Sequence, residues 1–143
     1  MIKLGDAYDE QNIFAKILRG EIPSIKLYED EMTLAFMDIM PQAEGHCLVI
    51  PKEPAVTFLD LSDEAAAAVM ATAKKLAAAV IKAVDAPGFM MVQLNSSHAG
   101  QTVPHYHMHI LPRHEGLELK FHTRDPEDME VLGALAEKIR AAL

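Results

Sequence analysis

A chain of 143 residues has the size of one domain and is long enough to bury a hydrophobic core without disulfide or metal support. Its formal net charge of -8 at pH 7 argues against a nucleic-acid-binding surface, because such surfaces neutralise phosphates with Lys and Arg. The single cysteine, Cys47, excludes an internal disulfide, and we find neither a signal-peptide pattern nor an apolar run of membrane-spanning length, so we expect a cytoplasmic protein with no membrane partner.

The first half of the chain predicts a short helix followed by three strands. Four apolar residues recur at helical spacing and are followed by glycine and proline, namely Ile13, Phe14, Ile17 and Leu18. Apolar runs bounded by turn residues then predict strands at residues 24–30, 32–39 and 46–51. Successive strands joined by short turns favour an antiparallel meander. Cys47 lies in the third of these runs, which predicts a buried, unreactive thiol.

The second half predicts a long helix, two further strands and a C-terminal helix. Ser62 is a suitable N-cap, and the Ala-rich segment after it extends to about Val84. Residues 89–95 and 104–112 predict strands on either side of a polar loop. Asp125 precedes a proline and several acidic residues, which predicts a capped final helix. We therefore expect an α+β fold with one five-stranded antiparallel sheet covered by helices, plus a C-terminal helix.

The stretch PHYHMHILPR places three histidines at every second position, namely His105, His107 and His109. Strict alternation with apolar residues is typical of a strand, which would put the three imidazoles on one face. At about 3.3 Å per residue, the outer two Cα atoms would lie about 13 Å apart. Three ligands spread over that length do not converge easily on one ion with bonds of about 2 Å. A two-histidine metal pair with ligands from elsewhere stays open.

This pattern also suits phosphoryl chemistry. An imidazole can attack as a neutral base or donate a proton when charged, because its unperturbed pKa lies near neutral pH. If His107 attacks an electrophilic phosphorus, one flanking histidine can hold its tautomer while the other stabilises the phosphoryl oxygens or protonates the leaving group. In the preceding loop the Gly100 backbone can approach a ligand closely, and Gln101 and Thr102 can donate hydrogen bonds to an anion.

The motif His-x-His-x-His followed by two apolar residues resembles the signature of the histidine triad family of nucleotide hydrolases and transferases. Three blocks, the last of which contains this motif, resemble successive family blocks in the same order: NIFAKILRGEIPS, LAFMDIMPQAEGHCLVIPK and GQTVPHYHMHILPR. The resemblance covers about residues 10–115 and implies the family fold. We expect a single domain over residues 1–143, of which residues 116–143 form a variable C-terminal extension.

The resemblance also implies roles for individual residues. His107 matches the nucleophile, which forms a covalent nucleotidyl-histidine that water then resolves, and His109 matches the contact to the α-phosphate. His105 and His46 match the residues that orient and polarise the nucleophile. Asp38 matches the acid that binds the ribose hydroxyls. On the residues alone, Asp38 would cap a turn and His46 would be an ordinary residue at a strand edge.

The remaining implied contacts surround the nucleotide. Polar contacts to the phosphate and leaving group fall on Asn95, Gln101 and Thr102, next to Gly100. The apolar slot for the base falls on Phe14, Ile17, Ile39 and Leu48. Several of these apolar residues also suit the core, since a short helix must bury its apolar stripe.

Two departures from the family pattern bear on metals and substrates. Many bacterial members carry a zinc-binding Cys-x-x-Cys pair where this chain has Asn12 and Ala15, and often a histidine where it has Pro54, so we expect no metal and no cofactor. The chain has no tryptophan, unlike the branch that hydrolyses aminoacyl phosphoramidates. The resemblance implies a homodimer.

The expected function is a nucleotide hydrolase that cleaves at the α-phosphate of purine nucleoside phosphoramidates or related nucleoside monophosphate conjugates through a covalent nucleotidyl-histidine. Three alternatives stay open. The same residues could cleave dinucleoside polyphosphates, or the pocket could belong to a regulatory protein that binds nucleotides without turnover. A metal-dependent module could use His46, His105 and His107.

Overall fold

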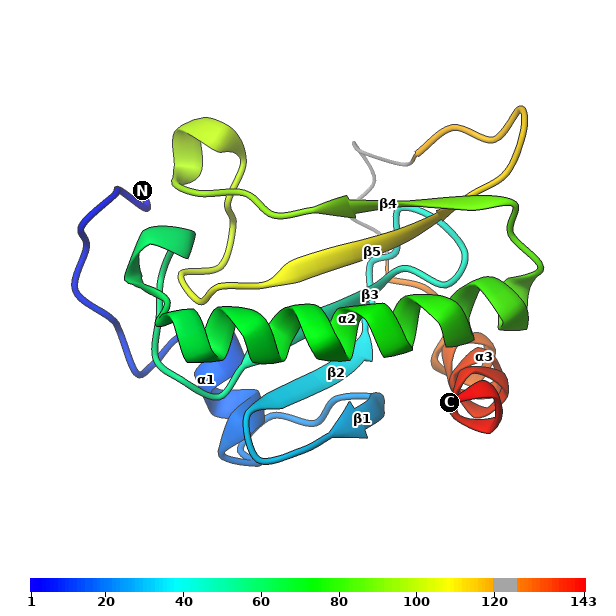
Figure 1. The fold of residues 1–143 in the computed structure, drawn as a ribbon, viewed down its shortest axis with the longest axis horizontal. Coiled ribbons are helices and arrows are strands. Elements are labelled where there is room, and N and C mark those ends of the chain that lie inside the picture. Colours follow the sequence, from blue (N-terminus) through cyan, green and yellow to red (C-terminus); the bar gives the residue numbers. More distant parts are fainter. Residues whose placement is uncertain (120–125) are drawn as a thin grey trace.

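The computed structural model describes residues 1–119 and 126–143 of the chain. Its centre is an antiparallel sheet with the strand order β1-β2-β3-β5-β4 (Figure 1). The strands are β1 (Lys26–Glu29), β2 (Thr33–Met37), β3 (Cys47–Pro51), β4 (Gly88–Val92) and β5 (Met108–Arg113). The predicted α+β fold with a five-stranded antiparallel sheet is therefore confirmed.

Helices cover both faces of this sheet. The long helix α2 (Asp63–Val84) and the C-terminal helix α3 (Met129–Ala142) pack together on one face, and the short helix α1 (Ile13–Leu18) packs on the other. Every residue of β2 and β3 is buried as a result, because each strand is covered on both sides. Within the described residues, no helix combines the length and the apolar character needed to cross a membrane.

Alternation along the strands divides the core into two clusters. On the α2 side, buried residues of β2, β3 and β5 such as Ala35, Val49 and Ile110 pack against α2 and α3. On the α1 side, Leu48 and its neighbours pack against Phe14 of α1. Successive strand residues point to opposite faces, so the side chain that directly precedes Ile110 on β5 must point toward the α1 side. That side chain is His109.

Capping residues fix the helix starts. The Ser62 side chain accepts a hydrogen bond from the Ala65 backbone N–H at 3.1 Å, as predicted for α2. In α3 the N-cap is Asp128, whose carboxylate accepts from the Glu130 N–H at 2.7 Å. The predicted cap, Asp125, lies outside the described residues. The final helix itself is present, as expected.

The strand predicted for residues 104–112 is wrong in its first half, because β5 begins only at Met108. The pairing of β5 with β3 extends no further than Met108 opposite Val49. The preceding backbone takes other partners, since the Tyr106 N–H donates to the Ala55 carbonyl at 2.8 Å. The three histidines therefore do not share one strand, and only His109 lies within it.

A tight turn brings the chain back into β3. Gly45 has a φ of +87°, a left-handed conformation that disfavours any residue with a Cβ. A Cβ at this position would also lie 3.1 Å from the side chains of Val80 and Pro112. The turn therefore lies directly against α2 and β5. It delivers the next residue, His46, to the edge of the α1 face beside β5.

Candidate active site

Three imidazole rings meet on the α1 side of the sheet. His46 immediately precedes β3, His109 is the second residue of β5, and His107 immediately precedes β5. Because Leu48 of β3 pairs with His109, the start of β3 lies beside the start of β5. The ring centroids of His107 and His109 are 4.9 Å apart, and those of His46 and His109 are 5.1 Å apart.

His107 presents a free lone pair. Its Nδ1 lies 2.7 Å from the carbonyl oxygen of His105, and a carbonyl only accepts, so Nδ1 carries the proton. In the neutral ring the lone pair is then on Nε2. Burial lowers the pKa of His107 below its usual value, which keeps the ring neutral at pH 7. The Phe14 ring stands edge-on to it with a centroid distance of 5.0 Å and fixes its orientation.

His46 and His109 hold the opposite tautomer. The backbone N–H of Gln42 donates to Nδ1 of His46 at 3.0 Å, so the proton of His46 must be on Nε2. That N–H donates in turn to Nδ1 of His109 at 2.8 Å, which leaves the proton of His109 on Nε2. Burial is the main cause that lowers the pKa of His46 to about 4 and that of His109 to about 3.

The two neighbouring rings therefore offer complementary groups. His107 has a lone pair on Nε2, and His109 has an N–H on Nε2. A nucleophilic nitrogen and a hydrogen-bond donor side by side can attack a phosphorus and stabilise its oxygen at the same time. Both groups are held in place by hydrogen bonds to the protein before any ligand arrives.

His105, the first histidine of the motif, has no free ring nitrogen. Its Nε2 donates to the carbonyl of Pro51 at 2.9 Å, so its Nδ1 accepts from the Tyr8 hydroxyl at 2.6 Å. The side chain is fully buried. Its link to His107 runs through its backbone carbonyl, which accepts the His107 Nδ1–H.

Asp38 lies at the edge of this group of histidines. Its Oδ2 is 3.4 Å from Nε2 of His46, and its Oδ1 accepts from the Met40 N–H at 2.8 Å. The carboxylate thus caps the turn after β2 and also belongs to the site. Burial raises its pKa. The next residue, Ile39, is 45% exposed, so its side chain is available to a ligand.

The predicted apolar slot is partly assembled. Phe14 and Leu48 are buried in one cluster with other residues of β2 and β3, and Ile17 packs against it half-buried. Phe14 contacts the His107 ring, so this cluster borders His107 directly. Ile39 is not part of the buried cluster. These side chains form part of the hydrophobic core on the α1 side.

The polar loop is built by residues that were expected to contact phosphate. Gln101 is buried, its amide nitrogen donates to the carbonyls of Val56 and Val103, and its oxygen accepts from the Ser96 N–H. Its amide therefore shapes the loop in this structure. Thr102 is exposed on the same loop.

Asn95 and Gly100 complete the loop. The Asn95 side chain accepts from the Phe58 N–H at 2.7 Å and donates to the Gln93 oxygen at 2.8 Å. Gly100 has a φ of +98°, and a Cβ there would lie 3.3 Å from the Leu94 side chain. The glycine is thus required by the turn itself. The polar loop and the histidines follow one another directly in sequence.

One group of described residues has the composition of a metal site. Asp38, His46 and His109 each offer a ligand atom within 4.8 Å of the others. The His46 and His109 nitrogens are 2.8 Å apart, closer than the roughly 3.3 Å between two nitrogen ligands of a tetrahedral zinc ion. In this arrangement the Nε2–H of His46 lies between the two nitrogens and donates to Nδ1 of His109. The alternative set of His46, His105 and His107 is not assembled, because both nitrogens of His105 are taken.

Tyr8 was missed by the sequence reasoning. It lies in a polar N-terminal segment with no periodic pattern, 97 residues before His105. Nothing local marks it, because its role depends on a contact that only the folded chain creates. A single tyrosine in a polar N-terminal segment therefore forms no sequence pattern that could predict a role in the site. The cap residue Asn12, which accepts from the Ala15 N–H, ends the same segment.

Comparison with known proteins agrees with this geometry. Residues 19–116 match the HIT domain family. The chain is 39% identical over 134 residues to adenosine 5'-monophosphoramidase hnt1 of Schizosaccharomyces pombe, covering 90% of this chain and 98% of that protein. It is 39% identical over 103 residues to adenylylsulfatase HINT3 of Arabidopsis thaliana, covering 72% of this chain and 52% of that protein. Both names describe hydrolases.

A solved structure shares the whole fold. A crystal structure of a HIT-like protein from Bartonella henselae superposes with a TM-score of 0.90 at 50% identity, covering 96% of this chain and 100% of that one. The match of residues 19–116 spans more than half of the 143 residues, and it includes the complete histidine motif. The chain belongs to the histidine triad (HIT) family of nucleotide hydrolases.

Proposed function

We propose that this protein hydrolyses nucleoside phosphoramidates or related nucleoside monophosphate conjugates by attack of His107 on the α-phosphate. The observation that carries the proposal is the pair of tautomers, with a lone pair on Nε2 of His107 next to the N–H of His109. The attack forms a nitrogen–phosphorus bond to His107 and breaks the bond from phosphorus to the leaving group. The leaving amine takes up a proton from water, and the hydrolysis step that follows releases one.

The second half of the reaction restores the enzyme. Water attacks the nucleotidyl phosphorus, the bond to His107 breaks, and a nucleoside monophosphate leaves. The His107 ring becomes positively charged while it carries the phosphorus, and the His105 carbonyl opposite its Nδ1–H stabilises that charge. The N–H of His109 donates to an oxygen of the α-phosphate in both steps.

The nucleoside would extend away from the triad toward Asp38. Its carboxylate accepts the ribose hydroxyls, and the exposed side chain of Ile39 together with the Phe14 and Leu48 cluster contacts the base. The two named relatives support adenosine, because both names describe conjugates of adenosine monophosphate, one with an amine and one with sulfate. The two names share the adenosine monophosphate part and differ in the group attached to it.

The proposed function predicts both a substrate order and a stereochemical result. We expect kcat/KM to be higher for adenosine phosphoramidates than for diadenosine polyphosphates, measured side by side by product chromatography. Hydrolysis of a P-chiral phosphorothioate analogue in isotope-labelled water should proceed with overall retention, because two successive displacements each invert phosphorus. Inversion would contradict a covalent intermediate. Nucleotide binding by calorimetry with no product from either substrate would favour a regulatory binding protein.

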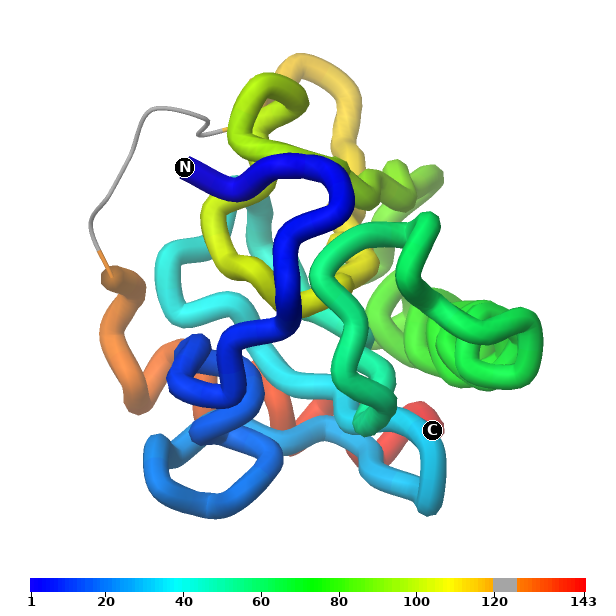
Figure 2. Tube along the Cα trace, turned by 90° about the vertical axis from the view of Figure 1, so that its left-hand side faces the viewer, coloured from blue at the N-terminus to red at the C-terminus, as the bar shows by residue number. Residues whose placement is uncertain are grey.

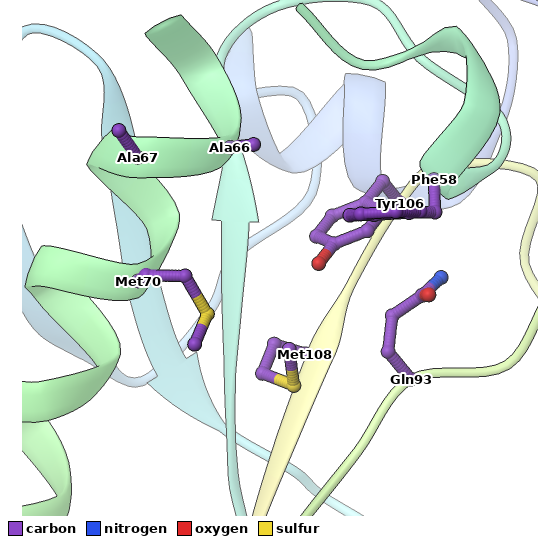
Figure 3. Close-up of a pocket in the computed structure, with 7 residues that line it drawn as sticks. All are labelled: Phe58, Ala66, Ala67, Met70, Gln93, Tyr106 and Met108. Atoms are coloured by element: carbon purple, nitrogen blue, oxygen red, sulfur yellow. The ribbon is translucent and has the colours of Figure 1, made fainter. Parts of the chain in front are cut away.

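We also propose that the protein is a homodimer joined through β4 and α2. Strand β4 is at an edge of the sheet, and its residues Phe89, Met90 and Met91 are 38–41% exposed. An apolar groove of about 500 Å³ lies between α2 and β5, where Met70 and Met108 face the Phe58 and Tyr106 rings (Figure 3). An apolar edge strand that no other element covers is prone to pair with a strand of another chain.

The proposed homodimer predicts that a charged side chain placed in the interface separates the two subunits. A second apolar groove of about 470 Å³ is lined by Met70, Phe89 and Met91. We expect Met91→Glu to sediment as a monomer at concentrations where the wild type sediments as a dimer, because the substitution places a charge in the buried interface. Met129→Glu is the matched control, since Met129 is 58% exposed on α3. A monomeric wild type would contradict the proposal.

A further inference from the structure

The contact of Tyr8 with His105 links the N-terminal segment to the nucleophile. The hydroxyl is 2.6 Å from Nδ1 of His105, and the two rings meet edge-on with centroids 5.6 Å apart. Since Nε2 of His105 donates to Pro51, Nδ1 has no proton and the hydroxyl must be the donor. Tyr8 therefore satisfies the one remaining acceptor of a fully buried imidazole.

Tyr8 is linked to His107, the residue proposed to react, through one intervening residue, His105. The carbonyl of His105 accepts the Nδ1–H of His107, and this hydrogen bond decides that the lone pair of His107 is on Nε2. The position of the His105 carbonyl depends on how its side chain is held. Two hydrogen bonds from opposite sides, to Tyr8 and to Pro51, hold that ring in one orientation.

The N-terminal segment is fixed at both ends, which places Tyr8. At one end the Ile2 N–H donates to the Ser97 hydroxyl at 2.7 Å and the Ser97 N–H donates to the Ile2 carbonyl at 2.8 Å. At the other end Asn12 caps α1. Figure 2 shows the segment in blue, passing along one end of the molecule from the loop around Ser97 to α1. Tyr8 lies between these two attachments, half-buried.

We propose that Tyr8 is a positioning residue for the reaction proposed above, holding the His105 ring in one orientation so that its carbonyl orients His107. The inference rests on the proposed function for its effect on turnover. Tyr8 touches neither the phosphorus nor the nucleotide in this scheme. It acts through His105, and its hydroxyl is the part that matters.

Removing the hydroxyl tests this directly. In Tyr8→Phe, Nδ1 of His105 is left buried without a donor, so the imidazole is expected to turn from its present position, and His107 loses its single orientation. We expect kcat to fall about tenfold, while KM changes less than about twofold, because nucleotide contacts are untouched. Tyr28→Phe is the matched control, since its hydroxyl donates to Asp30, away from the histidines.

A spectroscopic measurement separates positioning from simple loss of stability. Nitrogen NMR of the ring atoms should show His105 Nδ1 as a hydrogen-bonded acceptor with one set of signals in the wild type and in Tyr28→Phe, and shifted or multiple His105 signals in Tyr8→Phe. Unchanged His105 signals or an unchanged kcat in Tyr8→Phe would overturn the inference. A loss of kcat no larger than the fraction of unfolded protein under assay conditions, derived from urea unfolding, would overturn it too.

The same two readouts distinguish this inference from the proposed function. If the wild type hydrolyses no conjugate, the proposed function fails, and with it the catalytic effect assigned to Tyr8. If the wild type is active and Tyr8→Phe behaves like Tyr28→Phe in turnover and in the His105 spectrum, the function stands and only the role of Tyr8 is overturned. Shifted His105 signals with reduced kcat and unchanged KM are the result we expect.

Discussion

Replacing His107 with alanine is expected to lower kcat/KM by about 10⁴-fold or more, because the substitution removes the nucleophile. No other described ring offers a lone pair at this place, since the Nε2 of His109 carries a proton and His105 is bonded at both nitrogens. Nucleotide binding should persist, because Asp38 and the apolar cluster are unchanged. Steady-state kinetics and calorimetry measure the two effects separately.

The covalent intermediate gives this prediction a second readout. Rapid denaturation during turnover should trap wild-type protein with one added nucleotidyl group, detected by intact mass spectrometry, and the group should map to His107. His107→Ala should show no adduct. His98→Ala is the control, because His98 is exposed in the loop before the site and should keep both activity and adduct. An adduct on another residue, or full turnover without His107, would disprove the assignment.

Local patterns were enough to predict the fold. The N-cap at Ser62 and the end of α2 at Val84 follow from capping chemistry and helix-forming composition, which act within a few residues. The strands β2 and β3 follow from continuous apolar runs bounded by turns. The histidine motif predicted the candidate site because its spacing is local too, and the family resemblance extended the prediction to distant positions such as Asp38, which lies beside His46.

The errors and omissions come from long-range contacts. Alternation predicted a strand through His105, but the backbone before Met108 turns away from β3 to bond Ala55, a partner some 50 residues earlier that no local pattern reveals. Gln101 suggested an anion contact by its type, whereas its buried amide closes the loop onto Val56. The contact of the Tyr8 hydroxyl with His105 could not be predicted for the same reason. Tautomers, which decide the chemistry, depend entirely on such contacts.

Stability is expected to fall steeply as the pH drops from 7.5 to 5.5, because the site buries neutral histidines. Folding lowers the pKa of His46 and His105 to about 4 and that of His109 to about 3, against about 6.5 in an unfolded chain. Above pH 6.5 neither state is protonated, and the stability is fully present. Below pH 6.5 the histidines of the unfolded state bind protons while those of the folded state stay neutral. Stability therefore falls until the pH reaches the folded-state pKa values.

The size of this effect follows from the number of histidines. One pH unit below the unfolded value, each such group costs about 1.4 kcal/mol, so three together cost roughly 4 kcal/mol at pH 5.5. The lowered pKa of His107 adds in the same direction. Asp38 acts in the opposite sense, since its raised pKa favours proton uptake by the folded state as the pH falls. One carboxyl offsets only part of the loss from several imidazoles.

Urea unfolding at pH 7.5 and 5.5 measures this loss, with His46→Gln as the informative variant. Glutamine can still donate a hydrogen bond toward His109 but does not titrate, so the variant should lose about 1.4 kcal/mol less than the wild type over this range. His98→Ala, which removes an exposed histidine, should lose as much as the wild type. Equal losses in His46→Gln and wild type would mean that His46 is already protonated in the folded state at pH 5.5. A protonated His46 cannot accept the Gln42 N–H at Nδ1, so the hydrogen bond from which the tautomer of His46 follows would then be absent at pH 5.5.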